Sequence, residues 1–405
     1  MSLRLNEKRL CIAYAAGPGD VVKTFSYWQK GMDDLNQTSV TYSSLFFDVC
    51  KNINARGVAI SSCTRVDSIR TEQFLVTNMP KGKEKKGIAF HLQQIRYVRK
   101  IIRIAATEGA DILVMADATG HFFPYIWFAP LRLKFVPSLH CNLWSRFMPL
   151  SPLQKIINKL NAYIFTQTAT AILSVSPSIN AQIAKITNNN SRPIYRFYQL
   201  YRKTLFDSIA PPNLSSDCFN LLFVGRLETE KGVFDLLQIA EQLMQQEKSK
   251  VIIHLCGNGS CENELRKATK EKELEESFII HGFCCQDEMV RHINASHAFI
   301  VPTKSTFEEG YNKVVVEALL SGRPVITSSV CVYPDLEKLS EAVVEVPPDD
   351  IKGYISAIQR LASDKQYYLE KTANSHNEQE KFYASSFSWR AALEKIIIDA
   401  QLECP

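Results

Sequence analysis

The sequence reads NLLFVGRLETEKGVFDLLQIAEQL at residues 220–243, and this stretch decides the fold. The mostly apolar run 220–224 has the length of a buried strand, whereas the apolar residues from 234 onward recur at the spacing of a helix. Gly225 supplies the turn between them. A strand, a glycine turn and a helix in this order are typical of one unit of a parallel sheet covered by helices.

The same alternation of short apolar runs and helical segments continues along the whole chain. In the first half, the runs that predict strands are residues 10–16, 57–61, 112–116, 135–139 and 171–175. In the second half they are residues 220–224, 250–255, 277–280, 298–301, 324–327 and 342–345. Two parallel sheets in succession predict an α/β fold class, with two Rossmann-like domains that face each other across a cleft.

A chain of 405 residues is too long for one ordinary core, since single cores rarely exceed about 250–300 residues. We expect an amino-terminal domain over residues 1–205 and a carboxyl-terminal domain over residues 206–380. The polar span 187–216, which contains Asn and Pro, is interpreted as the linker between them. For residues 381–405 we expect a helix that packs back toward the amino-terminal domain.

The two halves of the chain differ in charge. Residues 1–205 hold 27 Lys and Arg against 11 Asp and Glu, whereas residues 206–405 hold 20 against 31. Between Asp117 and Asp207 there is no acidic residue, although ten Lys or Arg fall there. This sustained positive field predicts an anionic partner for the amino-terminal domain.

The 11 Cys residues lack the paired spacing of metal ligands, so we expect neither a disulfide framework nor a zinc site. Residues 1–9 do not contain the apolar segment of a signal peptide. Prolines and basic residues interrupt the most apolar stretch, 121–139, which argues against a membrane-spanning helix. These features predict a cytoplasmic chain with reduced thiols.

Two cations follow the strand at 220–224. Arg226 and Lys231 lie before the helix, where the unpaired amides and the dipole of a helix start favour anions. The positive charges of both side chains could neutralise a pyrophosphate bound there without a metal ion. The alternative is that both are ordinary solvated loop cations.

A second stretch reads FEEGYNKVVVEALLSGRPVI at residues 307–326. Its apolar residues 314–320 predict a buried helix that ends at Gly322. Because a helix rises ~1.5 Å per residue, we expect Glu309 and Glu317 to lie about 12 Å apart, close to the span of a nucleotide sugar. Carboxylates accept hydrogen bonds from hydroxyls, so the pair fits a sugar at one end and a ribose at the other. The alternative is that Glu309 caps the helix and Glu317 pairs with a neighbouring cation.

Together these motifs resemble the retaining glycosyltransferases of family 4, which have the GT-B fold. The resemblance covers most of residues 218–362. It is carried by FVGRL at 223–227, KG at 231–232, LCGNG at 255–259, HGF at 281–283, and the glutamates at 309 and 317.

The resemblance implies a role for each of these residues. Arg226 and Lys231 would hold the donor diphosphate and stabilise it as it leaves, Glu309 would bind the sugar hydroxyls, Glu317 the ribose, and the loop at 282–283 the base. The expected donor site consists of Gly17, Gly19, Gly225, Arg226, Lys231, Gly257, Gly282, Phe283, Glu309, Gly310, Tyr311, Asn312 and Glu317. The family also implies front-side attack with retention of anomeric configuration, with no bound metal and no cofactor besides the nucleotide-sugar co-substrate.

In the amino-terminal half the resemblance is limited to two places. Gly17 and Gly19 follow the first predicted strand, where the family has a glycine-rich loop beside the cleft; a simple turn is the alternative. His140 follows the strand 135–139 and matches a family histidine that contacts the donor sugar, so we count it with Arg226, Lys231 and Glu309 among the catalytic residues. His121 is a second candidate, for which an ordinary hydrogen-bonded loop histidine is the favoured alternative.

The expected activity is transfer of a hexose from a UDP- or GDP-sugar to a lipid-linked or polysaccharide acceptor in cell-surface glycan biosynthesis. The amino-terminal domain would bind the acceptor and the carboxyl-terminal domain the donor. The alternatives are a sugar-nucleotide epimerase of similar fold and a catalytically silent partner protein.

A basic segment, KGKEKKG at 81–87, precedes an amphipathic helical pattern with basic residues at 96, 99, 100 and 103. Together with the aromatic residues at 122–128, it suggests peripheral docking on the anionic inner face of a membrane. The alternative is that these segments cover the sheet. We expect no nucleic-acid partner, because no binding motif accompanies the charge.

Overall fold

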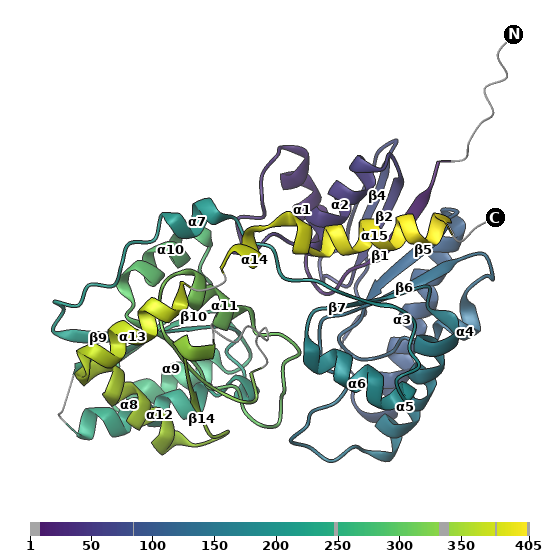
Figure 1. Ribbon diagram of the computed structural model, residues 1–405. Coiled ribbons are helices and arrows are strands. Elements are labelled where there is room, and N and C mark those ends of the chain that lie inside the picture. Colours follow the sequence, from purple (N-terminus) through teal and green to yellow (C-terminus); the bar gives the residue numbers. More distant parts are fainter. Residues whose placement is uncertain (1–8, 84, 247–249, 332–339, 377–378, 403–405) are drawn as a thin grey trace, which may run out of the picture.

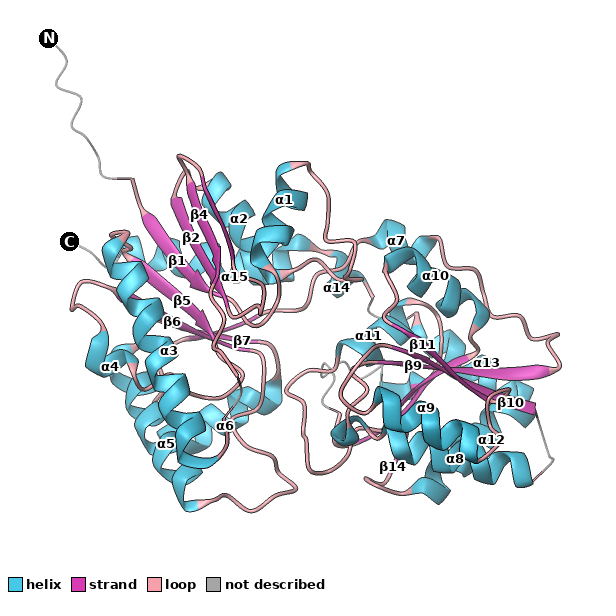
Figure 2. Cartoon of the chain, turned by 180° about the vertical axis from the view of Figure 1, so that it is seen from behind, coloured by secondary structure: helices cyan, strands magenta, loops and turns pink. Residues whose placement is uncertain are grey.

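The computed structural model describes residues 9–83, 85–246, 250–331, 340–376 and 379–402. Figure 1 shows two lobes, and Figure 2 shows the sheet of each lobe with helices packed over it. The predicted α/β fold class with two parallel-sheet domains is confirmed. Among the described helices, none combines the length and the apolar character needed to cross a bilayer.

Within the described residues, the amino-terminal sheet has eight strands, and all neighbours are parallel except β3 and β4. In spatial order they are β3 (Asp67–Arg70), β4 (Phe74–Asn78), β2 (Arg56–Ser61), β1 (Cys11–Ala15), β5 (Ile112–Ala116), β6 (Lys134–Leu139), β7 (Ile172–Ser174) and β8 (Ile194–Arg196). The central strands β1 and β5 are buried along almost their whole length, as their continuous apolar sequences require.

In the part of the chain that the structure describes, the carboxyl-terminal sheet has six strands, all parallel. In spatial order they are β11 (Phe278–Gly282), β10 (Lys250–Cys256), β9 (Cys218–Val224), β12 (Ala298–Val301), β13 (Val325–Ser328) and β14 (Val343–Val346). The order changes direction at β9 and β12, so the loops after these two strands diverge and leave room for a ligand at their carboxyl ends.

Helices connect the strands in both domains. In the first half they are α1 (Val21–Gln29), α2 (Tyr42–Asn52), α3 (Gly87–Thr107), α4 (Tyr125–Phe128), α5 (Pro152–Tyr163), α6 (Pro177–Thr187) and α7 (Lys203–Asp207). In the second half they are α8 (Val233–Gln245), α9 (Glu262–Glu271), α10 (Gln286–Ala295), α11 (Lys313–Leu320), α12 (Ile351–Ser363), α13 (Lys365–Ser375), α14 (Glu380–Tyr383) and α15 (Trp389–Leu402).

The span 187–216, interpreted from the sequence as linker, contains regular structure. Its strand β8 pairs with β7 at the edge of the amino-terminal sheet, and α7 follows it. Leu200 packs in the amino-terminal core and Tyr201 in the carboxyl-terminal core, so the chain passes between the cores within one residue. A linker this short restricts how far the domains can move apart.

The last helix, α15, lies against the amino-terminal domain (Figure 1). Trp389 at its start is fully buried, with its ring 5.2 Å from that of Tyr14. Its indole Nε1 donates a hydrogen bond of 3.0 Å to Ser138 Oγ. The end of the chain therefore crosses back over the domain boundary and completes the first core.

Candidate active site

Two positions in the loops after β9 and β10 require glycine, because a side chain there would collide with a neighbouring loop. Gly257 has a φ of +146°, and a Cβ atom there would fall 1.8 Å from the carbonyl oxygen of Gly225. Gly232 has a φ of +75°, and a Cβ atom on it would fall 2.2 Å from the carbonyl oxygen of Pro302. These contacts bring the loop that carries Arg226 and Lys231 directly against its neighbours.

Lys231 and Glu309 form an ion pair at the start of α8. The Lys231 Nζ atom contacts Glu309 Oε1, and both side chains are largely buried. The Asn312 side-chain amide donates to the other carboxylate oxygen of Glu309 and caps α11 by accepting from Val315 N. Burial lowers the pKa of Lys231 to about 8.

Arg226 is the exposed member of the predicted cationic pair. Its guanidinium lies 3.4 Å from Glu230 and 6.0 Å from the centre of the Phe307 ring. Lys231 approaches the same ring at 5.0 Å. Both cations thus lie on one side of the carboxyl-terminal domain. The ion pair of Arg226 with Glu230 is screened by solvent, so exchanging Glu230 for an anionic ligand would cost little free energy.

Glu309 does not lie on the helix that carries Glu317. The helix α11 begins at Lys313, and Glu309 lies in the preceding loop, where it forms an isolated bridge with Cys331. The expected spacing of about 12 Å assumed one continuous helix through both residues, and that premise is wrong because α11 begins after Glu309. The Asn312 cap begins the helix after Glu309 rather than before it.

Glu317 is buried and bonds to the opposite domain. Thr38 Oγ1 donates to Glu317 Oε1 at 2.6 Å, and burial raises the pKa of this carboxyl group. The nearby Lys313 donates to Ser39 Oγ at 3.3 Å and partly offsets the shift of Glu317. A buried carboxylate held by one hydroxyl can accept a further hydrogen bond from a ligand.

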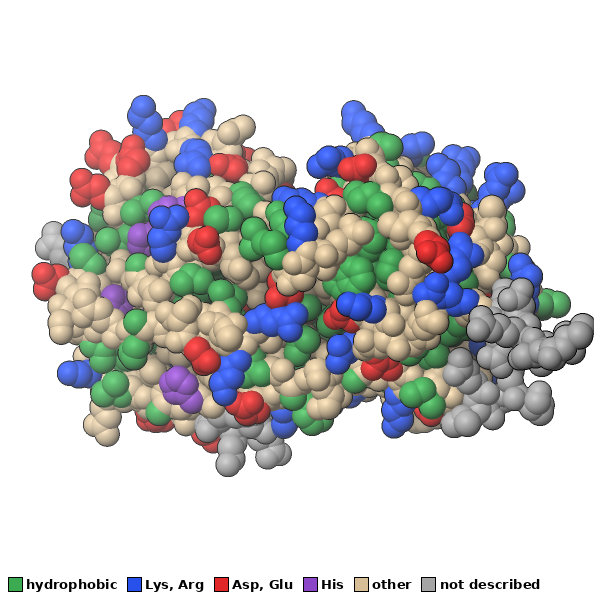
Figure 3. Space-filling view, turned by 90° about the horizontal axis from the view of Figure 1, so that it is seen from above, with side chains coloured by type: hydrophobic (Ala, Val, Ile, Leu, Met, Phe, Trp, Pro, Cys, Tyr) green, Lys and Arg blue, Asp and Glu red, His purple; other side chains and the backbone are tan. Residues whose placement is uncertain are grey.

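A cavity of about 270 Å³ lies between the domains beside Glu317. Figure 3 shows the notch between the two lobes from above. The residues 36–38 line it from the amino-terminal domain. The residues of the predicted donor site that line it are Gly225, Arg226, Gly257, Phe283 and Glu317.

The loop after β6 meets the loop before α11. A Cβ atom on Gly310 would fall 2.6 Å from Cys141 Cα and 2.7 Å from Asn142 N, so the two domains touch here through backbone. The Asn142 side chain donates to the carbonyl oxygen of Glu309 at 3.5 Å. The residue before this contact is His140, which is therefore beside the Glu309 loop.

His140 is a neutral histidine. Burial lowers its pKa to about 3, and the charge of Lys313 acts in the same direction. Its Nε2 atom lies 2.9 Å from Ser138 Oγ, and its buried Nδ1 atom has no hydrogen-bond partner among the described residues. Such an atom is available to a ligand.

Other predicted residues lie elsewhere or have structural roles. Tyr311 packs against the cores of both domains. Gly17 and Gly19 have no neighbouring atom within 4 Å of the position that a Cβ atom would take, and Gly17 lines a separate small cavity of about 60 Å³. His121 is buried and bonded to Thr119 and His91, as the ordinary alternative expected.

Sequence reasoning missed an ion pair that joins the two domains. The guanidinium and the backbone N–H of Arg146 both donate to Glu308, whose side chain is completely buried. Arg146 also donates to the carbonyl oxygen of Ser329 at 3.1 Å. Nothing in the local sequence distinguishes Glu308 from Glu309, since the partner lies 162 positions away.

Comparison with known proteins finds glycosyltransferases among the relatives of this chain. Residues 207–381 match the family model described as glycosyl transferases group 1. An uncharacterised glycosyltransferase of Methanocaldococcus jannaschii is 22% identical over 310 residues, which cover 72% of this chain and 75% of the relative.

Solved structures show the same fold. WaaG, a glycosyltransferase involved in lipopolysaccharide biosynthesis, aligns with a TM-score of 0.66 and 13% identity over 95% of this chain and 99% of its own. HepE of Anabaena, solved with UDP and glucose, aligns with a TM-score of 0.61 and 14% identity over 97% and 100%. Together the family match and these structures support a GT-B glycosyltransferase.

Proposed function

We propose that this chain is a retaining, metal-independent hexosyltransferase that uses a UDP- or GDP-sugar. The observation that carries the proposal is the contact of Lys231 with Glu309 at the point where Gly310 meets the opposite domain. A cation and a carboxylate side by side suit a donor in which a diphosphate adjoins a polyhydroxylated ring.

The residues around this point would divide the donor between them. Lys231 and Arg226 bind the diphosphate and stabilise it as it leaves, and Glu309 accepts hydrogen bonds from the sugar. The cavity beside Glu317 receives the nucleoside, with the ribose on the carboxylate and the base near Phe283, which is 56% exposed. The HepE complex contains UDP and glucose, which supports a donor of this class.

His140 would act without titrating. Since its pKa is about 3, the ring is neutral at physiological pH, and its free Nδ1 can accept from or donate to a sugar hydroxyl. The acceptor enters from the amino-terminal side. Attack on the face from which the diphosphate leaves retains the anomeric configuration, and Arg226 and Lys231 supply the charge that a metal ion supplies in other transferases.

The acceptor we propose is lipid-linked or polymeric, at the inner face of a membrane. Arg99 and Arg103 of α3 and Trp127 of α4 line an open groove, and Trp127 is 56% exposed. The aromatic run is not wholly available, because Phe122, Phe123 and Tyr125 are buried in the core. WaaG, named for lipopolysaccharide biosynthesis, has the same fold, which agrees with this acceptor class.

The donor and the reaction can be tested together. Thermal shifts with UDP-, GDP- and ADP-sugars identify the donor, because a ligand that binds only the native state raises its melting temperature. Lys231→Ala should abolish both the shift and transfer, whereas Lys272→Ala, which removes an exposed pair with Glu241, should change neither. Full transfer by Lys231→Ala would falsify the assignment, and epimerised donor without transfer would favour the epimerase.

Membrane docking has a separate test. Vesicles with anionic lipid should co-sediment the chain at low salt and release it at high salt. The double variant Arg99→Ala, Arg103→Ala should lose most of this binding, while Lys272→Ala keeps it. Equal sedimentation with neutral vesicles would exclude charge-driven docking.

A further inference from the structure

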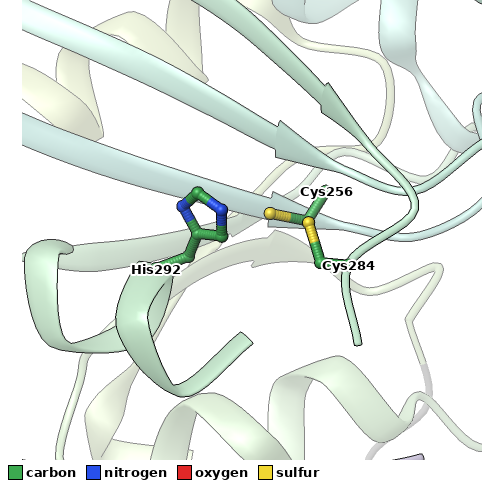
Figure 4. Close-up of side chains that lie close together, drawn as sticks. All are labelled: Cys256, Cys284 and His292. Atoms are coloured by element: carbon green, nitrogen blue, oxygen red, sulfur yellow. The ribbon is translucent and has the colours of Figure 1, made fainter. Parts of the chain in front are cut away.

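Two cysteines and a histidine of the carboxyl-terminal domain lie side by side at the wall of the donor cavity. A ligand atom of each, from Cys256, Cys284 and His292, lies within 4.8 Å of the other two. Figure 4 shows the side chains directed toward one another. Cys256 is buried, whereas Cys284 and His292 are partly exposed, so a small ion can reach all three from solvent.

The topology brings these residues together from distant positions. Parallel pairing aligns Cys256, at the end of β10, with Gly282, at the end of β11. Cys284 follows two residues later, and α10 carries His292 back over the strand ends. Because α10 is anchored by the buried Met289 and Ile293, its histidine is held in place by the core.

The donor set is that of a zinc site. Zn²⁺ binds thiolates at about 2.3 Å and imidazole nitrogens at about 2.0–2.1 Å, which places the ligand atoms of a tetrahedral site about 3–4 Å apart. Small side-chain rotations bring the three atoms from their present separation to that geometry. Two sulfur ligands and one nitrogen select Zn²⁺ over Mg²⁺ or Ca²⁺, which prefer oxygen.

Neighbouring imidazoles restrict the histidine ring. The centre of the His281 ring lies 4.0 Å from that of His292. His281 Nε2 in turn lies 3.0 Å from His254 Nδ1. Packing against the His281 ring limits the rotation of the His292 side chain.

We propose that Cys256, Cys284 and His292 bind one Zn²⁺ ion, with solvent at the fourth position, as a clamp in the wall of the donor cavity. Cys256 precedes Gly257, and Cys284 follows Phe283, so the ion ties together the two loops that form one wall of that cavity. Binding replaces the two thiol protons, which are released to solvent. The ion does not contact Lys231 or Glu309 and takes no part in the transfer itself.

The test begins with metal alone, on the full chain purified with a reductant and then stripped with a chelator. Titration with Co²⁺ should give one equivalent with the near-ultraviolet absorption of cobalt thiolates, and Zn²⁺ should displace it and raise the melting temperature. Cys284→Ser and His292→Asn, both at partly exposed positions, should weaken Co²⁺ binding at least about 10-fold.

Cys285→Ser is the matched control. Cys285 is the N-cap residue of α10 beside the cluster, and its backbone N–H donates to Glu288 Oε2 at 2.8 Å. Serine keeps this backbone hydrogen bond, so the variant should bind Co²⁺ as the unchanged chain does. Absence of thiolate absorption in the unchanged chain, or equal binding by Cys284→Ser, would overturn the site. A Cys256–Cys284 disulfide that persists under the reductant and blocks Co²⁺ would also overturn it.

The clamp's effect on the donor rests on the proposed function and is measured separately. With Zn²⁺ bound, the UDP dissociation constant should be several-fold lower than in the stripped chain, and Cys284→Ser should not respond to Zn²⁺. Metal binding with an unchanged UDP affinity refutes the clamp. If neither the zinc-bound chain nor the stripped chain binds UDP, the proposed donor is contradicted, whereas the metal stoichiometry still stands.

Discussion

Thr38 in the amino-terminal domain donates a hydrogen bond of 2.6 Å to Glu317 in the carboxyl-terminal domain. The bond joins the loop before α2 to the buried face of α11. Closure of the two domains therefore determines the environment of a carboxyl group expected to bind the ribose. Burial at this contact raises the pKa of the Glu317 carboxyl group, so its protonation should affect stability as the pH changes.

The first prediction concerns this carboxyl group. Burial raises the pKa of Glu317 above its ordinary value of about 4.3, so the folded chain holds the proton more tightly than the unfolded chain. The free energy of unfolding should fall as the pH rises from about 4.3 to the raised pKa, and stay lower above it. In Glu317→Gln this fall should be absent, measured as urea midpoints from about pH 4.5 to about pH 8.

Glu275→Gln is the control, because Glu275 is exposed and its removal should leave the pH dependence unchanged. If Glu317→Gln and the unchanged chain show parallel midpoints across the range, the carboxyl group is not desolvated in solution.

The second prediction concerns the backbone contact at Gly310. A methyl group there meets Cys141 Cα and Asn142 N, neither of which can move without its loop. Gly310→Ala should therefore open the contact and lower the transfer rate about 100-fold, since displacement by about 1 Å can have that effect. Small-angle scattering should show a larger radius of gyration, with the melting of each domain nearly unchanged.

Gly17→Ala serves as the control for the scattering measurement, because no neighbouring atom lies within 4 Å of its Cβ position. An unchanged scattering curve for Gly310→Ala would mean that the domains do not make this contact in solution.

Much of the fold could be predicted because its signals are local. The apolar runs that became β1, β5 and β12 are continuous, as expected of strands buried on both faces. The strands β3 and β4 were missed, since β3 is half exposed and pairs antiparallel at the sheet edge. β8 was missed because three residues among polar neighbours carry no periodic pattern.

In the candidate site, too, the residues in local motifs could be predicted, and those with distant partners could not. Arg226, Lys231 and Glu309 belong to motifs that can be recognised in a single sequence. Thr38 and Arg146 reach their partners across 279 and 162 positions, and no local pattern marks them. No paired spacing marks Cys256, Cys284 and His292 in the sequence, yet adjacent parallel strands bring such distant residues together.

The third prediction compares two ion pairs that cross the domain boundary. Arg146→Met removes the guanidinium partner of the buried Glu308, and the expected cost is about 1–3 kcal/mol, because the backbone N–H of residue 146 still donates. Arg202→Met breaks a pair with Asp33 in which both side chains are partly exposed, so its cost should stay below about 1 kcal/mol. Urea unfolding of both variants measures the difference. Equal costs would show that Glu308 is hydrated in solution.

The fourth prediction concerns His140, whose pKa burial lowers to about 3 against an ordinary value of about 6.5. The folded chain then binds fewer protons than the unfolded chain between these values, so the free energy of unfolding falls with decreasing pH by up to about 1.4 kcal/mol per unit. His140→Asn, which cannot titrate, should lose this dependence between about pH 6.5 and 5, whereas the exposed His376→Asn should keep it. The same burial predicts that the transfer rate shows no inflection from His140 between about pH 6 and 8. An inflection there that disappears in His140→Asn would mean that the ring is hydrated and charged in the working enzyme.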